Sequence, residues 1–288
     1  MVGLWAVPEY ATVSRFNWPL CTLYVLLHGS LLLAAPTFSW AGLVAFCVLY
    51  FMTICLGITL CYHRLLAHQS YRLPEGLTVA LAFLGCLAFQ RGPIWWSACH
   101  RLHHARVDRS GDPHSPKQSI LWSHFLWPFF RHPQLDEDPE TLRRLAGDLY
   151  QKPGLCWLER HYTAINVGFL ALLFAVGYWA GGLSLGLSLL VWGGLLRILI
   201  CLHFTWLVNS VAHLWGARRF DTNDTSRNNL LVALLTWGEG WHNNHHAHPR
   251  SARMGFGRFE PDVTFVVIRL LRRLGLATDV QDYLRSSG

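Results

Sequence analysis

The stretch WAGLVAFCVLYFMTICLGITLCYHRLLAH (residues 40–68) joins a long apolar run to a pair of histidines. The run from residue 40 to residue 62 carries no charged side chain. Such a run is long enough to cross the hydrocarbon core of a bilayer, about 30 Å thick, as an α-helix. His63 and His68 follow at its end, so the sequence predicts a transmembrane helix with imidazoles at one membrane surface.

The composition indicates a membrane protein. Of the 288 residues, 52% are hydrophobic and only 14% are charged, whereas a soluble domain carries about 25% charged residues. The formal net charge is +7, but the basic residues lie mostly between apolar runs instead of forming one face, so we expect no nucleic-acid partner. The eight cysteines include no C-x-x-C pair and are predicted to be free thiols. No basic start with an apolar core follows Met1, so we expect no removable signal peptide.

Four apolar runs are long enough, or nearly so, to span a membrane. They cover approximately residues 18–35, 40–62, 162–180 and 183–207. Short connections without Lys or Arg join the first two and the last two, so each pair is predicted to form a hairpin. The expected fold is all-α: a single domain over residues 1–288, built on a four-helix transmembrane bundle.

A fifth apolar stretch, residues 73–90, is short and begins with Leu-Pro-Glu. If it crossed the membrane, the histidines at 63–68 and at 100–104 would lie on opposite sides and could not share a metal. We therefore predict an interfacial or re-entrant helix. The histidine-rich parts 63–160 and 208–288 then form a helical cap on one side of the membrane, where they carry a dimetal site.

Basic residues give the orientation. Most Lys and Arg outside the apolar runs lie on the histidine side, which the positive-inside rule assigns to the cytoplasm. The sequence thus predicts a multi-pass integral protein of the lipid bilayer, with its active site and both termini on the cytoplasmic side. Arg197, inside the run 183–207, does not fit this scheme unless it snorkels or lines a polar cavity.

The histidines recur in tight groups. In HRLHH (100–104) and HNNHH (242–246) they stand at positions i, i+3 and i+4, which share one face of an α-helix. Asn209 and His213 in NSVAH (209–213) are likewise i and i+4. His63 and His68 are five apart, about 140° around an α-helix, so they either serve different metals or straddle a helix end.

These groups predict a dinuclear metal centre. Adjacent imidazoles on one face repel one another when protonated and gain little when neutral, unless a cation binds them. Nine candidate imidazoles exceed what one tetrahedral zinc ion uses. The sequence contains no H-E-x-x-H, and Glu-x-x-His occurs once, at 239–242, whereas carboxylate-rich di-iron bundles use two such motifs. Imidazole-rich sites with open positions suit redox iron, although copper, nickel and zinc also bind imidazole.

Taken together, HRLLAH, HRLHH, NSVAH and GEGWHNNHHAHP resemble the membrane fatty acyl desaturases of the stearoyl-CoA (delta-9) type, over roughly residues 40 to 275. GDPHSP (111–116) matches the family's Asp-Pro-His segment. The resemblance implies two iron ions, dioxygen as co-substrate and a cis double bond, with delta-9 as the expected position, introduced into a saturated acyl chain. It implies as metal ligands His63, His68, His100, His103, His104, His213, His242, His245 and His246, with Asn209 contacting one metal through water.

The resemblance also assigns a substrate tunnel. Gln90, Trp96, Thr205 and Trp206 stand where the family fixes the bend of the acyl chain, although the two tryptophans alone would suit an interfacial aromatic belt. Animal acyl-CoA members have an Arg-Asp pair before the second histidine box, and here Ala98 and Cys99 take its place. Acyl-CoA is therefore the expected substrate, with an acyl-lipid or a carrier protein as alternatives. We expect three carboxylates to orient the imidazoles: Asp108, Asp112 and Glu239. The alternative for the two aspartates is that they are exposed in a Pro-rich turn.

Residues 247–288 are too few for a haem or iron–sulfur domain. The expected electron donor is therefore a separate ferredoxin or cytochrome b-type carrier with its reductase. Residues 261–277 mix apolar and basic residues, as either an interfacial or an ordinary packing helix would. One rival function is a di-iron hydroxylase or ketolase of an alkyl, sterol or carotenoid substrate. Another is a histidine-rich metal transporter, whose ligands should instead lie in the middle of its spans.

Overall fold

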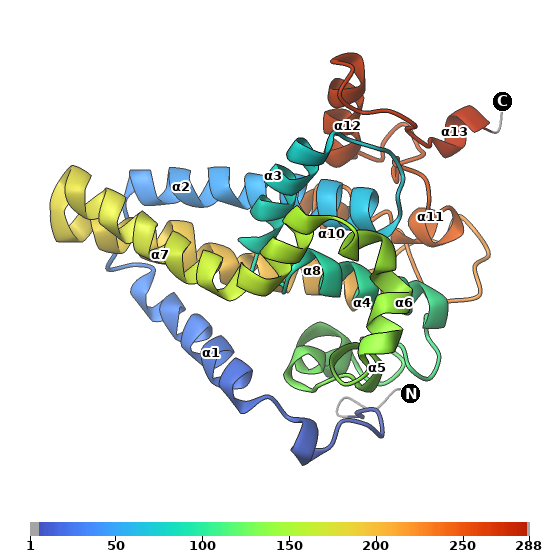
Figure 1. Ribbon diagram of the computed structural model, residues 1–288, viewed down its shortest axis with the longest axis horizontal. Coiled ribbons are helices and arrows are strands. Elements are labelled where there is room, and N and C mark those ends of the chain that lie inside the picture. Colours follow the sequence, from blue (N-terminus) through green and yellow to red (C-terminus); the bar gives the residue numbers. More distant parts are fainter. Residues whose placement is uncertain (1–5, 287–288) are drawn as a thin grey trace.

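The computed structural model describes residues 6–286, and in that part of the chain every regular element is helical (Figure 1). The all-α prediction is confirmed. The prediction that both termini lie on the cytoplasmic side falls on residues outside the described range. The main helices are α1 (Trp18–Gly29), α2 (Trp40–Tyr50), η3 (Phe51–Ala67), α3 (Glu75–Cys86), α4 (Pro93–Arg106), α5 (Pro133–Asp136), α6 (Pro139–Tyr150), α7 (Pro153–Ser188), η6 (Leu189–Leu196), α8 (Arg197–Asn209), α9 (Val211–Leu214), α10 (Leu230–Leu235), α11 (His242–Ala247), α12 (Val263–Arg273) and α13 (Tyr283–Ser286). Short turns of helix complete the set: η1 (Val13–Arg15), η2 (Ser30–Leu33), η4 (Trp122–Leu126) and η5 (Trp127–Phe129).

Two continuous helices are long and apolar enough to cross a membrane. Trp40–Ala67 joins α2 to η3, and Pro153–Leu214 joins α7, η6, α8 and α9. The second contains both of the runs predicted at 162–180 and 183–207. The first predicted run, 18–35, forms a shorter apolar helix over Trp18–Leu33 and then a turn that includes Pro36, a residue that cannot continue a helix.

The long helix Pro153–Leu214 is folded into a hairpin. Its backbone leaves the helical conformation at Gly181 and Gly182, and Gly182 has a φ of 70°, which glycine adopts without a steric penalty. The two arms touch closely beside this turn, since a Cβ at Gly177 would lie 2.7 Å from the carbonyl oxygen of Leu185. The sequence AGG thus reverses the chain, as the hairpin prediction required.

The ends of the apolar helices meet at one end of the molecule (Figure 1). The hydroxyl groups of Ser39 and Ser188 lie 2.7 Å apart, and the Trp192 indole N–H donates to the Ala34 carbonyl at 3.1 Å. The turn between α1 and α2 therefore contacts the returning arm of the α7 hairpin. This end lies away from the histidine-bearing helices α4 and α11 (Figure 1).

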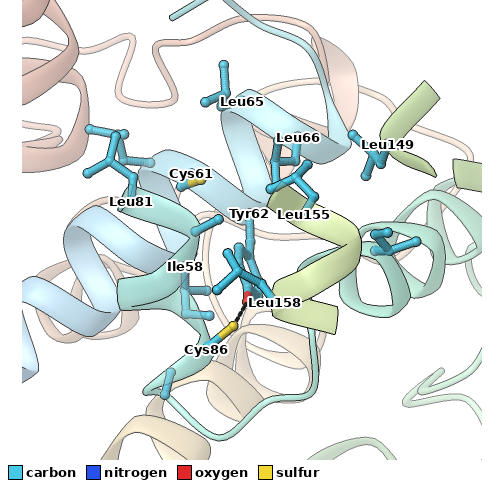
Figure 2. Close-up of a cluster of buried hydrophobic side chains, with 14 of the residues drawn as sticks. Ile58, Cys61, Tyr62, Leu65, Leu66, Leu81, Cys86, Leu149, Leu155 and Leu158 are labelled. Carbon is cyan, nitrogen blue, oxygen red and sulfur yellow. Dashed lines mark hydrogen bonds between the residues drawn. The ribbon is translucent and has the colours of Figure 1, made fainter. Parts of the chain in front are cut away.

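Helix α3 packs along η3 and runs back toward the apolar end. A Cβ at Gly57 would lie 2.4 Å from the backbone nitrogen of Gly85, so the two backbones are in direct contact. Figure 2 shows Tyr62 of η3 pointing at Cys86 at the end of α3, with the hydroxyl 3.2 Å from the sulfur. The chain then turns and α4 leads it back to the histidines.

The carboxyl end of α3 lies in the interior, and two side chains satisfy its terminal carbonyls. Asn166 of α7 donates to the Cys86 carbonyl at 2.9 Å, and Arg197 of α8 donates to the Leu87 carbonyl at 2.7 Å. Both donors are buried. A backbone carbonyl at membrane depth needs a partner inside the protein, because hydrocarbon offers none. Arg197 therefore serves to cap the end of α3, which explains why an arginine stands inside an apolar run.

The outer faces of the apolar helices expose many large hydrophobic side chains. Contiguous apolar surface of this kind marks contact with lipid or with another protein. On α1, α2 and α7 the exposed residues include Trp18, Val25, Leu26, Trp40, Val44, Val48, Val167, Leu172, Val176 and Trp179. The protein therefore associates with membranes through these helices.

Candidate metal centre

Five imidazoles from three helices form one group. His63 and His68 come from the end of η3, His100 and His104 from α4, and His245 from α11. One nitrogen of each lies within 4.8 Å of the others. The closest pairs of Nε2 atoms are His68 with His100 at 2.7 Å, His245 with His104 at 2.9 Å, and His63 with His245 at 3.1 Å. Nitrogens that face a common point in this way fit a bound cation.

Four further imidazoles form a second group beside the first. They are His103 from α4, His213 from α9, and His242 and His246 from α11. The Nε2 atoms of His242 and His213 lie 3.0 Å apart, whereas those of His103 and His246 are buried without a hydrogen-bond partner. Buried polar atoms without a partner are rare. These four nitrogens therefore also fit a metal ion, and the structure divides the predicted ligands five and four.

His63 and His68 approach each other because their helix is not an α-helix. Phe51–Ala67 is a π-helix, and the backbone N–H of His68 donates to the carbonyl of His63, five residues earlier, at 3.0 Å. The two ring centroids lie only 4.8 Å apart. Of the two alternatives for this pair, the rings straddle a helix end, because η3 ends at Ala67 and His68 follows it, and both rings join one group.

The three predicted carboxylates all lie beside the imidazoles and are buried. Glu239 contacts Nδ1 of His63, and Asp112 lies 2.9 Å from Nδ1 of His103. Asp108 acts through a hydroxyl group: Thr225 donates to it at 2.8 Å and lies 3.3 Å from Nδ1 of His213. Neither aspartate is an exposed turn residue.

Sequence reasoning missed several neighbours of the site. Asp224 lies 2.9 Å from Nδ1 of His246, and the buried Arg64 bridges Glu239 and Asp262, 2.9 Å from an oxygen of each. No spacing rule links these residues, because the contacts span long stretches of chain. His114 of the GDPHSP segment also lies at the site, its ring centroid 4.5 Å from that of His103.

Burial sets the protonation state of the cluster. The pKa values of His104, His242 and His245 are lowered well below the ordinary value, first by burial and then by neighbouring imidazoles. Burial alone would raise the pKa of the Asp112 carboxyl, but His103 outweighs this effect and lowers it. These three rings are thus neutral and the Asp112 carboxylate is charged near pH 7, and these are the states in which imidazole and carboxylate favour a bound metal cation.

The four predicted tunnel residues line one cavity of about 160 Å³ that reaches His100 and Asn209. The Gln90 amide donates to the Thr205 hydroxyl at 2.8 Å and accepts from the Trp96 indole at 3.2 Å. Trp206 is buried, so the aromatic-belt alternative does not describe it. Ala98 and Cys99 are buried as well, and Cys99 forms part of the cavity wall.

A smaller cavity of about 40 Å³ lies between the two histidine groups. Its wall includes His63 and His100 from the first group, His103 and His242 from the second, and Asn209 at the end of α8. Trp96 and Thr205 line both cavities. A ligand that fills the larger cavity would therefore come close to both histidine groups.

Comparison with known proteins agrees with this geometry. Residues 12–258 match the sequence model described as fatty acid desaturase. The chain is 40% identical over 274 residues to an sn-2 palmitoyl-lipid 9-desaturase of Nostoc, covering 95% of this chain and 93% of that protein. It is 39% identical over 273 residues to an sn-1 stearoyl-lipid 9-desaturase of Anabaena variabilis, covering 94% and 96%. An acyl-CoA C20 Delta5-desaturase of Anemone leveillei is 40% identical over 255 residues, covering 88% and 78%.

Proposed function

The chain belongs to the fatty acid desaturase family, and we propose that it places a cis double bond at the delta-9 position of a saturated acyl chain with two iron ions. As a desaturase it is an oxygen-dependent oxidoreductase. One observation carries the proposal: two adjacent groups of imidazoles border a cavity lined by Gln90, Trp96 and Thr205. An unactivated C–H bond resists side-chain acids and bases, so the bound iron ions would supply the oxidising chemistry with dioxygen.

The overall reaction balances with an external electron donor. One dioxygen, two electrons, two protons and a –CH2–CH2– unit give –CH=CH– and two water molecules. The proposed ligands of one iron are His63, His68, His100, His104 and His245, and those of the other are His103, His213, His242 and His246. Asn209, which lines both cavities, would contact one metal through water. A separate ferredoxin or cytochrome b-type carrier with its reductase would supply the electrons.

Four imidazoles share an arrangement that supports this ligand set. In each, Nδ1 has a polar partner, which leaves Nε2 for a metal ion and fixes the orientation of the ring. The pairs are His63 with Glu239, His103 with Asp112, His213 with Thr225, and His246 with Asp224. The chain's own contribution is therefore to hold these rings in the correct orientation before the metal binds.

The bend of the acyl chain would be held by neighbouring hydrogen-bonded groups. The Gln90 amide is fixed between the Trp96 indole and the Thr205 hydroxyl, so its position does not depend on substrate. The Trp96 ring also stacks on His100 with centroids 5.3 Å apart. A methylene pair placed at this bend would lie beside the imidazole cluster, and a fixed bend selects which carbons react.

In the membrane we propose four crossings, arranged as two hairpins, with the histidine-bearing cap in the cytoplasm. The helices Trp40–Ala67 and Pro153–Leu214 supply three crossings, because the second is folded at Gly182. The shorter Trp18–Leu33 would supply the fourth together with the turn that follows it. Helix α3 is re-entrant in this scheme, which agrees with its capped interior end.

Expression in a desaturase-deficient host tests the proposal. We expect a new monounsaturated acid with a delta-9 double bond from the intact chain and none from His103→Ala. His161→Ala is the matched control, because His161 is bonded to the carbonyl of Trp157 in its own helix. Hydroxylated lipid in place of the alkene would favour a hydroxylase, and an intact chain that binds no iron would refute the assigned site.

A further inference from the structure

Helix α12 has a buried face and an uncovered face. The buried face packs against the rest of the protein and consists of Thr264, Phe265 and Ile268. The opposite face carries an apolar row, which we define as Val266, Leu270 and Leu274, each more than half exposed. These three positions are four residues apart, so their side chains lie along one line on the helix surface. The part of the chain that the structure describes thus leaves the apolar row uncovered.

Arginines lie beside the apolar row. Arg269 and Arg273 are exposed and stand four residues apart, and the exposed Arg272 adjoins them. Among the described residues, no ion pair joins any of the three to a carboxylate. The carboxylates that are nearest in sequence already pair with other arginines: Glu260 with Arg219, Asp262 with Arg64, Asp279 with Arg72, and Asp282 with Arg253. The positive charge on this face of α12 is therefore uncompensated within the described chain.

The contact between α12 and η3 indicates the depth of α12 relative to a membrane. The Thr264 hydroxyl of α12 lies 2.7 Å from the Thr59 hydroxyl and 3.7 Å from the Cys55 sulfur, both on η3. Thr59 lies roughly 25–30 Å along this helix from Trp40, which is close to the thickness of a hydrocarbon core. Trp40 is exposed, as a tryptophan at the opposite membrane surface would be. Helix α12 therefore meets the span near the membrane surface on the histidine side.

The orientation of α12 and its neighbours agree with this depth. Figure 1 shows α12 lying across the direction of α2, as a helix along the membrane surface would. Helix α10 connects the two: the Tyr50 hydroxyl of α2 donates to the Leu235 carbonyl, and the Thr264 hydroxyl donates to the Trp237 carbonyl at 3.0 Å. Helix α10 also exposes apolar side chains, namely Leu230, Leu231 and Leu234. Exposed apolar surface thus continues from α2 over α10 to α12.

We infer that α10 and α12 form an anchor on the membrane surface and that Arg269 and Arg273 bind the phosphate groups of anionic phospholipids. The apolar row then enters the outer part of the hydrocarbon, while the guanidinium groups stay at the level of the head groups. Arginine suits this position, because its planar guanidinium donates two parallel hydrogen bonds to a phosphate and its apolar stem lies along apolar surface. The anchor is separate from the cavities at the histidines, so the inference does not depend on the proposed reaction.

Lipid binding to the purified full chain in detergent tests the phosphate contact. Native mass spectrometry compares bound dioleoylphosphatidylglycerol with bound dioleoylphosphatidylcholine, which have the same acyl chains and differ in head-group charge. We expect the wild-type protein to prefer the anionic lipid. The double variant Arg269→Gln, Arg273→Gln should reduce this preference about tenfold or more, because each cation near an anionic lipid surface contributes about a fivefold factor. Displacement of the lipid by inorganic phosphate would show a site for soluble anions and would overturn the inference.

The double variant Arg143→Gln, Arg144→Gln is the matched control. Both arginines are exposed on α6, which lies apart from α12 (Figure 1), and the variant removes the same charge. All four side chains are exposed, so we expect neither variant to change the thermal midpoint without added lipid. An equal loss of preference in the two variants would show an effect of net charge alone and would overturn the inference. An unchanged preference in the α12 variant would overturn it too.

Photo-crosslinking in phosphatidylglycerol vesicles identifies what covers the apolar row. With p-benzoylphenylalanine in place of Leu270, we expect adducts with the acyl chains of the phospholipid. The same probe in place of Asp221, whose side chain is fully exposed in a loop, should form few lipid adducts. A crosslinked dimer through position 270 would show that a second copy of the chain covers the row, and it would overturn the inference. Neither test measures desaturation, so the anchor and the proposed reaction are refuted by different results.

Discussion

Nδ1 of His103 lies 2.9 Å from Oδ1 of Asp112, and both side chains are buried. The same carboxylate accepts the backbone N–H groups of Asp108 at 2.9 Å and of His114 at 3.2 Å. The loop after α4 thus holds the carboxylate in place, and the carboxylate in turn holds the ring. Nε2 of His103 is left buried without a partner, facing the second histidine group.

Asp112→Asn should therefore weaken metal binding without unfolding the protein. The amide keeps the shape of the carboxylate but loses its charge, and loss of such an outer partner typically lowers metal affinity about 10–100-fold. Iron content after dialysis against a graded chelator measures the effect. Asp221→Asn is the control, because the Asp221 side chain is fully exposed. Equal iron retention by both variants would contradict the role of Asp112.

The metal-free protein should lose stability as the pH falls below about 6.5. Burial lowers the pKa values of His104, His242 and His245 in the fold, whereas unfolded imidazoles take up protons near pH 6.5. The unfolded state then binds more protons, so the free energy of unfolding decreases between about pH 6.5 and 5. His103, whose pKa Asp112 raises against the effect of burial, opposes this trend.

Thermal unfolding of the metal-free protein in lipid vesicles measures this dependence. The midpoint should be constant above about pH 7 and decrease steadily below 6.5. His104→Leu should reduce the slope because it removes one group whose pKa is lowered. A midpoint that is independent of pH between 7 and 5 would contradict the buried, neutral state of the cluster.

Gly57→Ala should disrupt the packing of α3 on η3. The added Cβ would lie 2.4 Å from the backbone nitrogen of Gly85, so one backbone must move, which costs about 1–3 kcal/mol or more. Gly168→Ala adds the same methyl group to α7 where nothing lies within 4 Å. We expect a lower thermal midpoint and less iron only for Gly57→Ala. Similar midpoints for the two variants would show that the close contact is not required.

Asn166→Leu should destabilise the interior end of α3. The change leaves the Cys86 carbonyl without the donor that now lies 2.9 Å away, and a buried carbonyl without a partner costs about 1–3 kcal/mol. Thr163→Leu, at an exposed position of the same helix, serves as the control. Thermal unfolding in lipid should show a lower midpoint for Asn166→Leu alone, and equal midpoints would remove the argument for a re-entrant α3.

Helical spacing predicted much of this site from sequence. HRLHH and HNNHH lie on helices, and the histidines of each contribute to the site, but the structure divides them between the two groups: His100, His104 and His245 in the first, and His103, His242 and His246 in the second. The AGG sequence correctly marked the hairpin turn. For His63 and His68 the sequence left two alternatives, and the pair straddles a helix end. The π-helix that brings the rings together cannot be recognised from hydrophobic periodicity, which assumes α-helical spacing.

Contacts between distant segments stayed beyond sequence reasoning. Arg197 looked misplaced in an apolar run, because its partner, the Leu87 carbonyl, is a backbone group that no motif reveals. Asp224 stands in a polar loop, and only the fold brings it to His246. The position of α1 against the cavity also depends on tertiary contacts, such as the Tyr24 ring stacked on Trp206 with centroids 5.7 Å apart.

Thr205→Val should alter which carbons are desaturated. The variant keeps the volume of the side chain but removes the hydroxyl that accepts from the Gln90 amide at 2.8 Å, so the proposed bend loses one of its fixed points. A looser bend lets the acyl chain settle in more than one position beside the metal ligands, and misplacement by about 1 Å can reduce the rate about 100-fold. We expect less product and a wider spread of double-bond positions, measured by mass spectrometry of derivatised fatty acids.

Thr53→Val is the matched control, because the buried Thr53 hydroxyl bonds to the carbonyl of Leu49 in its own helix and does not line the cavity. A single unchanged double-bond position in Thr205→Val would show that the Gln90–Thr205 contact does not define the bend.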